Sequence, residues 1–519
     1  MRKEKKTGTE YRVFTLLLYV IFSILMTAVI AGKKNMHTDE VLTYGLANAP
    51  EGWITLTNGE VYSPARKAWM DYVTVDENRF DYAVVWRNQA MDVHPPLYYA
   101  LIHTICSFFP GKFSLWFAGA VNLIFAVLTL WVSRRLLEEL TQDSDAVFWG
   151  TVFFILSAGI LSAVSFLRMY IMAMFEVTLV TWLFVQAVQR GCSWKFYSRL
   201  FIAAIAGALT HYYFLVYLFF ICVVYGVYLL LHKEFRSAVM VTLSMLLAGA
   251  AAVSLFPDMI RHMFLDNGNR GEESIRNLKD MSFSAYAERL RFFYDCVNEQ
   301  LAGGLLTCLL AAAILSVIYG IVHRRNHGKS QTAMPLLLLL LPGICYFLLV
   351  AKMAVLMECR YIVPVYAVVL VGIFSLLYRG VWIWIRQKYR KVTLWLVICA
   401  MTAGGWHVCE WEHLYLMSAE FLEKTEQYSE ENIIYVYDKK WKLVNGFFEA
   451  ENYHNAEFIN LEKRQLEGIH FKGESSLLVN ITNSCDQDSV LDKILEICPL
   501  LNTYEMVGGY DYTTTYYLQ

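Results

Sequence analysis

Two adjacent acidic residues follow the first long apolar run of the sequence. Asp39 and Glu40 stand in His37-Thr38-Asp39-Glu40, shortly after an uncharged segment that ends near Ala31. Carboxylates at the exit of a bilayer need solvent or partners, and two of them can supply a general base together with a metal ligand or a second hydrogen-bond acceptor. An acid pair at a helix start can equally complement the helix dipole. We therefore treat Asp39 and Glu40 as candidate catalytic residues that need further groups nearby.

A second polar motif, Asp92-Val93-His94-Pro95-Pro96-Leu97-Tyr98-Tyr99, stands further along the chain. The proline pair suits the start of a helix, and Asp92 and His94 would then project near the membrane surface beside Asp39. The alternative is an N-cap aspartate with a structural proline entry. Together, Asp39, Glu40, Asp92 and His94 are also an oxygen and nitrogen ligand set, so a divalent cation stays open.

Three cations stand at the ends of later apolar segments. Arg168 lies in Leu167-Arg168-Met169-Tyr170, Lys352 follows an apolar run, and Arg360 lies in Glu358-Cys359-Arg360-Tyr361. A guanidinium presents a planar fork that suits phosphate oxygens, and at an interface it can hold a phosphate whose hydrocarbon tail stays in the bilayer. The alternative, strongest for Lys352, is that the side chain extends to the lipid headgroups.

Two further polar residues interrupt apolar sequence. Glu176 follows Arg168 by about two helical turns, and an ionisable side chain inside a bilayer is costly enough to count as a functional hypothesis. Its candidate partners are Arg168 and His211, and a purely structural pairing is the alternative. His211, in Thr210-His211-Tyr212-Tyr213, is either a substrate ligand or the polar cap of a turn.

The elements that must position these groups are apolar helices. The chain has 519 residues, of which 57% are hydrophobic and 17% charged, whereas a soluble domain has about 25% charged residues. Eleven uncharged runs are long enough to cross a bilayer, namely Tyr11–Ala31, Phe113–Ser133, Ala146–Phe166, Met169–Gln189, Leu200–His211, Tyr212–Leu231, Ser237–Phe256, Leu301–Val322, Ala333–Ala351, Tyr361–Tyr378 and Val392–Val408. The shorter stretch Pro95–Phe109 predicts an interfacial helix.

Basic residues decide the predicted topology. With the N-terminus inside, the inner segments hold about 20 Lys and Arg and the outer connections, apart from the long first loop, about nine. We predict a cytoplasmic N-terminus, outer loops over 32–112 and 257–300, and an extracytoplasmic C-terminus. The first apolar run has no cleavage site after it, so a retained anchor in a plasma membrane, which suits a bacterium, is expected. The net charge of −2 gives no footprint for nucleic acid.

The last hundred or so residues have a different pattern. Short β-type runs at 433–437, 477–481 and 512–518 alternate with helical stretches at 440–450 and 488–497, which predicts a small α/β domain. We place the boundary between a membrane domain, 1–410, and an extracytoplasmic domain, 411–519. Gly508-Gly509 alone indicates a turn, and Cys485 and Cys498 form a weak candidate disulfide.

Taken in this order, the motifs resemble the GT-C superfamily of membrane glycosyltransferases. Within it they look most like the glycosyltransferase family 39-like branch of protein O-mannosyltransferases and lipid A aminoarabinose transferases. The resemblance rests on His37-Thr38-Asp39-Glu40, Asp92-Val93-His94-Pro95-Pro96-Leu97-Tyr98-Tyr99, Arg168-Met169-Tyr170 and Arg360-Tyr361-Ile362-Val363-Pro364. It covers roughly residues 11–378 and predicts a polytopic α-helical fold of about 11 spans.

The resemblance implies an enzyme that moves a hexose or pentose from a polyprenyl-phosphate carrier to a hydroxyl on the outer face, with inversion. The acceptor would be a protein, a lipid or a glycan. By the same resemblance, Asp39 would be the base and Glu40 would position the acceptor or a neighbouring cation, while Arg360 with Lys352 would hold the departing phosphate. No metal is implied. The residues expected to bind substrate are Asp92, His94, Tyr98, Arg168, Tyr170, His211, Lys352, Glu358, Arg360 and Tyr361.

Two other classes compete with this reading. A polytopic transporter or lipid flippase would carry ionisable groups near the midplane and repeated halves, whereas only Glu176 is deep and no repeat is evident. A surface assembly protein would need far fewer spans than eleven to anchor its tail.

Overall fold

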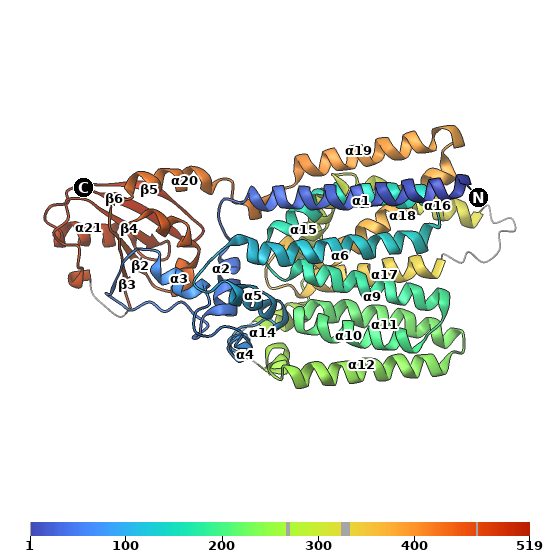
Figure 1. Cartoon of the computed structure of the whole chain (residues 1–519), viewed down its shortest axis with the longest axis horizontal. Helices are drawn as coiled ribbons and strands as arrows, with labels where there is room; N and C mark the ends of the chain where they lie inside the picture. Colours follow the sequence, from blue (N-terminus) through green and yellow to red (C-terminus); the bar gives the residue numbers. More distant parts are fainter. Residues whose placement is uncertain (1, 266–269, 323–332, 463–465) are drawn as a thin grey trace.

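The computed structural model describes residues 2–265, 270–322, 333–462 and 466–519. A bundle of long helices forms one end of the molecule and a β-sheet forms the other, with the short helices of the first loop between them (Figure 1). The first helix starts at the far end of the bundle, and the chain ends on the sheet. The predicted inner basic segment 324–329 lies outside the described residues.

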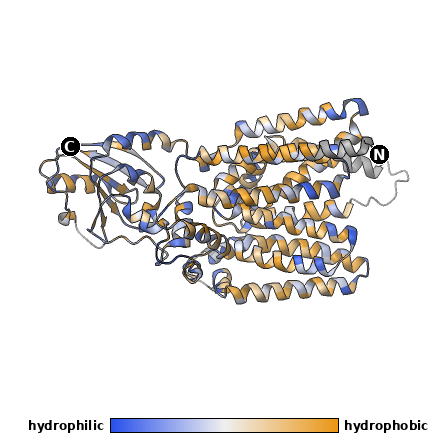
Figure 2. Ribbon diagram, viewed as in Figure 1, coloured by the Kyte–Doolittle hydropathy of each residue, from blue (hydrophilic) through white to orange (hydrophobic). Residues whose placement is uncertain are grey.

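The long helices are apolar around much of their circumference, as contact with lipid requires. Their bounds are α1 (Arg2–Ala31), α6 (Leu115–Thr141), α7 (Ser144–Ile155), α8 (Ala158–Ser165), α9 (Tyr170–Arg190), α10 (Trp194–Thr210), α11 (Tyr212–Leu231), α12 (Phe235–Leu255), α15 (Phe283–Ala302), α16 (Leu306–Val322), α17 (Ala333–Met353), α18 (Tyr366–Trp384) and α19 (Arg390–Val408). Figure 2 shows apolar residues dominating these helices and a mixture of polar and apolar residues on the sheet.

The number of full-length spans is slightly lower than the predicted eleven. Within the described ranges, eight helices are long and apolar enough to cross a membrane alone, and the number is ten if each of two bent helix pairs is one span. The remaining predicted segment, Leu200–His211, falls largely in α10, which has 17 residues. The polytopic helical fold is confirmed.

Two pairs of consecutive helices are bent. The predicted span Ala146–Phe166 forms α7 and α8, whereas α15, which lies almost entirely in the predicted outer loop 257–300, leads into α16 of the predicted span Leu301–Val322. The axes of α7 and α8 differ by 46°, and those of α15 and the first part of α16 differ by 87°. The sharper bend occurs at Gly303 and Gly304, whose φ angles are +59° and +84°. A Cβ at Gly303 would lie 2.2 Å from the carbonyl oxygen of Met401, so this corner requires glycine.

The loop after α1 is mostly ordered into short elements. They are α2 (Thr38–Asn48), β1 (Val61–Tyr62), α3 (Lys67–Val73), α4 (Tyr82–Met91) and α5 (Leu97–Phe108). Helix α5 begins directly after the Pro95-Pro96 pair and has only 12 residues, too few to cross a bilayer. The later loop contains α13 (Asp258–Ile260), the π-helical turn η1 (Arg261–Leu265) and α14 (Arg270–Lys279), and leads into α15.

The sheet at the end of the chain has six strands in the order β1-β3-β2-β4-β6-β5. Their bounds are β2 (Ile433–Tyr437), β3 (Ala456–Asn460), β4 (Leu477–Thr482), β5 (Tyr504–Tyr510) and β6 (Thr513–Leu518), with β1 coming from the first loop. Strand β2 runs parallel to β3 and β4, and the other pairs are antiparallel. The accompanying helices are α20 (Ser418–Thr425) and α21 (Gln487–Ile497).

Several short 3₁₀ helices complete the chain. They are η2 (Cys359–Tyr361), η3 (Val363–Val365), η4 (Gln387–Tyr389), η5 (Glu412–Leu414), η6 (Glu426–Tyr428), η7 (Lys440–Phe447), η8 (Glu449–Asn452) and η9 (Leu466–Gly468). The predicted helical stretch 440–450 therefore forms two 3₁₀ helices instead of an α-helix.

The sheet and the first loop share one hydrophobic core. The Trp69 indole of α3 donates a hydrogen bond to the Leu443 carbonyl at 3.2 Å and packs edge-on against Tyr435 of β2. Phe113 lies with its ring centroid 4.6 Å from that of Phe447. The predicted domain division at 410/411 stays a prediction, since the first loop contributes both a strand and core residues to the sheet.

One disulfide is present, and it was not predicted. It joins Cys296 of α15 to Cys359 of η2. Cys485 and Cys498, the candidate pair from the sequence, are free. Cys498 is buried at the end of α21, whereas the Cys485 thiol lies 3.2 Å from the Thr482 hydroxyl at the end of β4. The two thiols therefore contact different parts of the domain.

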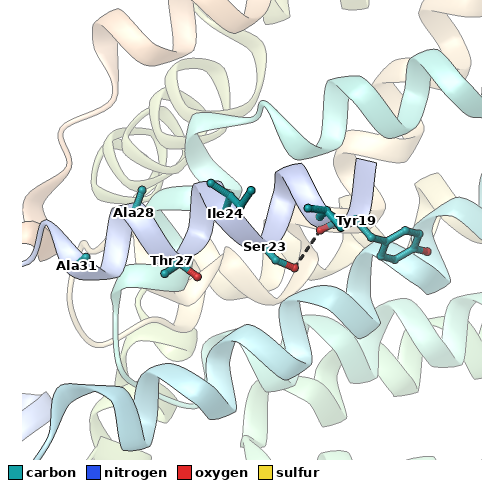
Figure 3. Close-up of a pocket in the computed structure, with 7 residues that line it drawn as sticks. Tyr19, Ser23, Ile24, Thr27, Ala28 and Ala31 are labelled. Atoms are coloured by element: carbon teal, nitrogen blue, oxygen red, sulfur yellow. Dashed lines mark hydrogen bonds between the residues drawn. The ribbon is translucent and has the colours of Figure 1, made fainter. Parts of the chain in front are cut away.

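Helix α1 presents an open groove on its outward side (Figure 3). Residues of α1 line the groove, and among them the Ser23 hydroxyl donates to the Tyr19 carbonyl at 2.9 Å. Neighbouring apolar side chains such as Leu16 and Ile24 are more than 60% exposed. This surface is therefore suited to lipid chains and offers no groups for chemistry.

Candidate functional site

The acidic motif of the first loop forms the cap of α2. The His37 ring accepts a hydrogen bond from the Asp39 amide at 3.0 Å, and the His37 amide donates to the Glu40 carboxylate at 2.6 Å. Such a reciprocal arrangement is a capping box, which fixes the start of a helix. It also fixes the direction of the Asp39 side chain. Burial lowers the pKa of His37 to about 4, so this ring is neutral at pH 7.

Glu40 is fully buried, and both oxygens of its carboxylate have partners within the protein. The Lys33 amine lies 2.9 Å from one oxygen, and the Leu167 amide donates to the other at 2.7 Å. Lys33 also contacts the carbonyl of His413. Glu40 therefore ties α2 to the residue before Arg168, and Lys33 is a partner that the sequence analysis missed.

Asp39 lies between two arginines from distant parts of the chain. Its carboxylate forms an ion pair with Arg360, and its carbonyl accepts a hydrogen bond from Arg168 at 3.0 Å. Burial alone would raise the pKa of Asp39, but the charges of Arg168 and Arg360 hold it well below its ordinary value. Asp39 is thus ionised at neutral pH. Its side chain is 26% exposed, so it remains accessible.

Arg168 is almost completely buried, with only 2% of its surface exposed. One guanidinium nitrogen donates to the Thr43 hydroxyl at 2.9 Å and to the Tyr99 phenol at 3.1 Å, and another lies 3.4 Å from the His94 ring. Its Nε has no hydrogen-bond partner among the described residues. Arg168 therefore keeps one buried donor without a partner among the described residues, which makes it a candidate for contact with an anion.

The second polar motif joins the same site through Arg168. Asp92 and His94 form a 2.7 Å pair, and the His94 ring lies near that of His211, with 6.5 Å between centroids. The His211 ring is in turn 5.2 Å from that of Tyr170. Burial lowers the pKa of His211 to about 3, so it is neutral. The neutral ring adds hydrogen-bonding capacity without adding charge.

Besides Asp39, a second acid and aromatic rings contact Arg360. Its Nε lies 2.5 Å from the Glu358 carboxylate, and its guanidinium lies 5.6 Å from the centre of the Tyr361 ring and 6.0 Å from that of Phe166. Phe166 stacks on Tyr170 at 5.7 Å. Cations near ring faces are stabilised by the ring quadrupole, so these rings help to hold Arg360 at the site.

Three predicted residues lie outside this cluster. The Tyr98 phenol is buried and donates to Asn122 at 2.9 Å, whereas its neighbour Tyr99 reaches Arg168. The Lys352 amine contacts the Asp280 carbonyl and lies over the Tyr286 ring at 5.2 Å. Glu176 accepts a hydrogen bond from Thr210 at 2.8 Å and pairs with neither Arg168 nor His211 in any recorded contact of the described residues.

The described residues hold no group of three or more His, Cys, Asp or Glu side chains that could bind a metal ion. The reason lies in the pairings, because Asp39 faces Arg360, Glu40 faces Lys33 and Asp92 faces His94. Cationic or polar side chains stand where a divalent ion would need free carboxylates. The acids of the site thus do not fit the ligand set considered from the sequence.

A cavity of about 230 Å³ adjoins Arg360. Helices α8 and α15 and the segment after α19 form its walls, and its lining residues are Ser162, Ala163, Phe292, Asp295, Cys296, Glu299, Gln300, Cys359, Arg360, Val363, Glu410, Glu412 and His413. Four carboxylates against one guanidinium disfavour an anion here. The cavity is smaller than the range of about 300–1,000 Å³ for drug-sized ligands, so it suits a small neutral or cationic unit.

The chain is similar in fold to known structures. No protein-family profile and no curated protein sequence matches the chain. Its structure is similar to that of ArnT from Cupriavidus metallidurans bound to undecaprenyl phosphate, with a TM-score of 0.57 and 11% identity over 97% of each chain. The chain therefore has a polytopic GT-C-like fold, as the motifs predict.

A weaker similarity links the chain to an archaeal oligosaccharyltransferase. The apo structure from Archaeoglobus fulgidus has a TM-score of 0.46 and 12% identity, and covers 95% of this chain and 69% of its own. The same protein, AglB, in complex with an inhibitory peptide and a dolichol-phosphate has a TM-score of 0.42 and 11% identity, over 90% of this chain and 69% of that one.

Proposed function

We propose that the protein is an integral membrane glycosyltransferase that moves a sugar from a polyprenyl-phosphate carrier to an acceptor hydroxyl, with inversion. The observation that carries the proposal is the meeting of Asp39 with Arg168 and Arg360 at the sheet end of the helix bundle. A carboxylate beside two guanidiniums offers a base and an anion clamp to one substrate. The similar ArnT structure holds undecaprenyl phosphate.

In the proposed reaction the donor phosphate lies against Arg168 and Arg360. The acceptor hydroxyl attacks the anomeric carbon while its proton passes to Asp39, and the bond between that carbon and the phosphate oxygen breaks. The phosphate gains one negative charge as it leaves. Two guanidiniums stabilise this charge, and they do so more strongly in a site that contains little water. Attack opposite the leaving group inverts the anomeric configuration.

The Asp39–Arg360 pair couples donor binding to the base. With Arg360 on its carboxylate, Asp39 has a lowered pKa and is a weak base. A phosphate that attracts the Arg360 guanidinium would weaken this pair and raise the basicity of Asp39. Donor binding would in this way activate the base that the second substrate needs.

Glu40, Asp92 and His94 are positioning residues in this proposal. Glu40 and Lys33 anchor the start of α2, whereas Asp92 orients the His94 ring that lies beside Arg168. Lys352 is left out of the phosphate clamp because its amine is engaged elsewhere. The resemblance implies a sugar donor, and the paired carboxylates support a reaction in which arginines stabilise the phosphate.

We further propose that the site faces the outside of a plasma membrane, with the N-terminus in the cytoplasm. The disulfide between Cys296 and Cys359 lies at the same end of the bundle as Arg360, and disulfides persist in oxidising compartments. The basic residues of the opposite loops support the same orientation. A bacterial envelope is the setting that this combination suits.

The function is tested with purified protein in lipid nanodiscs and a panel of undecaprenyl-phosphate monosaccharides. We expect release of undecaprenyl phosphate from one donor, which would name the sugar. Release from none of them, with release from a pyrophosphate-linked oligosaccharide, would change the donor class. Movement of intact donor across a sealed vesicle without release would instead indicate a flippase.

A further inference from the structure

The hairpin formed by β5 and β6 ends in a two-residue tip, Asp511-Tyr512. Tyr510 pairs with Thr513, and a bulge interrupts the register between Met506 and Gly508. The Gly508-Gly509 pair lies inside β5 and not in a turn, and a Cβ at Gly508 would come within 2.4 Å of the Phe421 ring. Bulges re-aim the residues beyond them, and they are frequent next to active sites.

The tip places Tyr512 against Trp441. The two ring centroids are 4.8 Å apart and the rings meet edge to face. The backbone of Tyr512 is held by the Asn483 amide, which donates to its carbonyl at 2.8 Å. Although it has these contacts, Tyr512 remains 37% exposed. The pair is therefore a fixed aromatic surface that is open to a ligand.

This surface lies beside the start of α2. Trp441 belongs to η7, which packs directly on α2, and Asp39 is the second residue of that helix. Tyr415 supplies a second link, because its ring centroid lies 6.4 Å from that of His37 at the start of α2. Helix α20, which begins three residues after Tyr415, packs on β5, so one short segment contacts both the hairpin and the start of α2.

The surroundings of the aromatic pair are polar. Lys442 lies with its amine 5.8 Å from the Trp441 ring and forms a 2.7 Å ion pair with Asp438 and a 2.5 Å hydrogen bond with Ser484. An aromatic face bordered by a carboxylate, an amine and hydroxyls matches a sugar, which has apolar C–H faces and a rim of hydroxyls.

We propose that Tyr512 and Trp441 form the acceptor subsite and that the acceptor is a saccharide. This inference rests on the proposed function, because it assigns the second substrate of the same site. A sugar ring packed on Tyr512 presents a hydroxyl toward Asp39 from the side opposite the bilayer. The donor lipid would approach from the bundle and the acceptor from the sheet, so the two substrates do not compete for one path.

Binding is tested with the full chain in nanodiscs by saturation-transfer NMR, which requires no turnover. The probes are the methyl glycosides of glucose, mannose, galactose and N-acetylglucosamine, together with an acetylated, amidated Ser-Gly-Thr tripeptide. We expect transfer to the ring protons of at least one glycoside, reduced at least fivefold by Tyr512→Ala and by Trp441→Ala. Tyr512→Phe should keep most of the transfer, because it retains the aromatic face.

The matched control is Tyr504→Ala, which removes an exposed tyrosine from the base of the same hairpin and should not alter the transfer. The proposal is overturned if Tyr512→Ala binds glycosides like the wild type, if no glycoside receives saturation from the wild type, or if only the peptide does. A chain that binds glycosides through Tyr512 but releases no polyprenyl phosphate from any donor would contradict the proposed function and leave the subsite standing.

Discussion

At the scale of single residues, the site is a set of charges that satisfy one another before any substrate arrives. Asp39 is paired with Arg360, Glu40 with Lys33 and Asp92 with His94. Removing one partner of a buried ion pair is costly, since the other charge stays behind without compensation. Such pairs hold side chains in fixed positions, and an entering phosphate can exchange with a carboxylate at a guanidinium.

The first prediction concerns Arg360 and Lys352, the two cations that the sequence analysis expected to hold the phosphate. Arg360→Gln should weaken binding of undecaprenyl phosphate by at least tenfold, because a charge-assisted contact with the phosphate is worth about 1.5–3 kcal/mol. Lys352→Gln should change the affinity by less than twofold, because its amine lies on the Asp280 carbonyl. Isothermal titration in nanodiscs measures both. Equal losses of affinity in the two variants would mean that Lys352 also binds the phosphate.

The second prediction concerns pH. His37 and His211 have pKa values of about 4 and about 3 in the folded protein, against an ordinary value of 6.5. The unfolded chain therefore binds more protons below pH 6.5, and stability should fall as the pH drops from 6.5 toward 4. At pH 5 the loss is about 2 kcal/mol for each histidine.

Thermal unfolding in detergent between pH 7.5 and pH 5 measures this loss. His211→Gln should flatten the decline, whereas His454→Gln, at an exposed position, should leave it unchanged. A melting temperature that stays constant across this range would mean that neither buried ring resists protonation.

At the scale of elements, short connections place the charges and long helices support them. Arg360 lies in η2 between α17 and α18, and Arg168 lies between α8 and α9. The disulfide ties η2 to α15 through the residue next to Arg360. A covalent link between two segments that are 63 residues apart in sequence thus lies next to the guanidinium.

The third prediction follows from that link. Cys296→Ser should lower stability by about 2–4 kcal/mol, and it should weaken undecaprenyl phosphate binding because η2 is released. Cys308→Ser, which changes an exposed free cysteine, serves as the control. Unchanged affinity in Cys296→Ser would show that helix packing alone positions Arg360.

The elements also show what the sequence could and could not reveal. Apolar runs predicted the helices, because hydropathy over twenty residues is a strong local signal. Strand β1 has only two residues and forms because β3 lies beside it, so no local pattern indicates it. The contact of Asp39 with Arg360 spans 321 residues, and only the motif resemblance placed these residues together. The register of α5 brings Tyr99, and not the predicted Tyr98, into contact with Arg168. The motif does not specify this register.

At the scale of the whole molecule, the site lies at the junction of the helix bundle and the sheet. Helices α2 to α5 occupy this junction (Figure 1), and the first loop supplies both the acid of the site and a strand of the sheet. A lipid-linked donor can therefore reach the site from the bilayer while a polar acceptor reaches it from the aqueous side.

The fourth prediction tests this orientation. In a background with Cys308→Ser and Cys399→Ser, a membrane-impermeant maleimide should label Glu430→Cys, beside the sheet, in intact cells. Arg236→Cys, at the opposite end of the bundle near the start of α12, should be labelled only after permeabilisation. The reverse pattern would place the site in the cytoplasm and contradict the proposed topology.

The central claim is that Asp39 is the base that takes the proton of the acceptor hydroxyl during transfer from a polyprenyl-phosphate sugar, and the most direct test is single-turnover release of undecaprenyl phosphate. With the productive donor and acceptor, Asp39→Asn should slow release by about 10²–10⁴-fold, measured at a temperature at which the variant is folded. Asp71→Asn, an exposed aspartate of the same loop, should react like the wild type. Near-normal release by a folded Asp39→Asn variant would contradict the account.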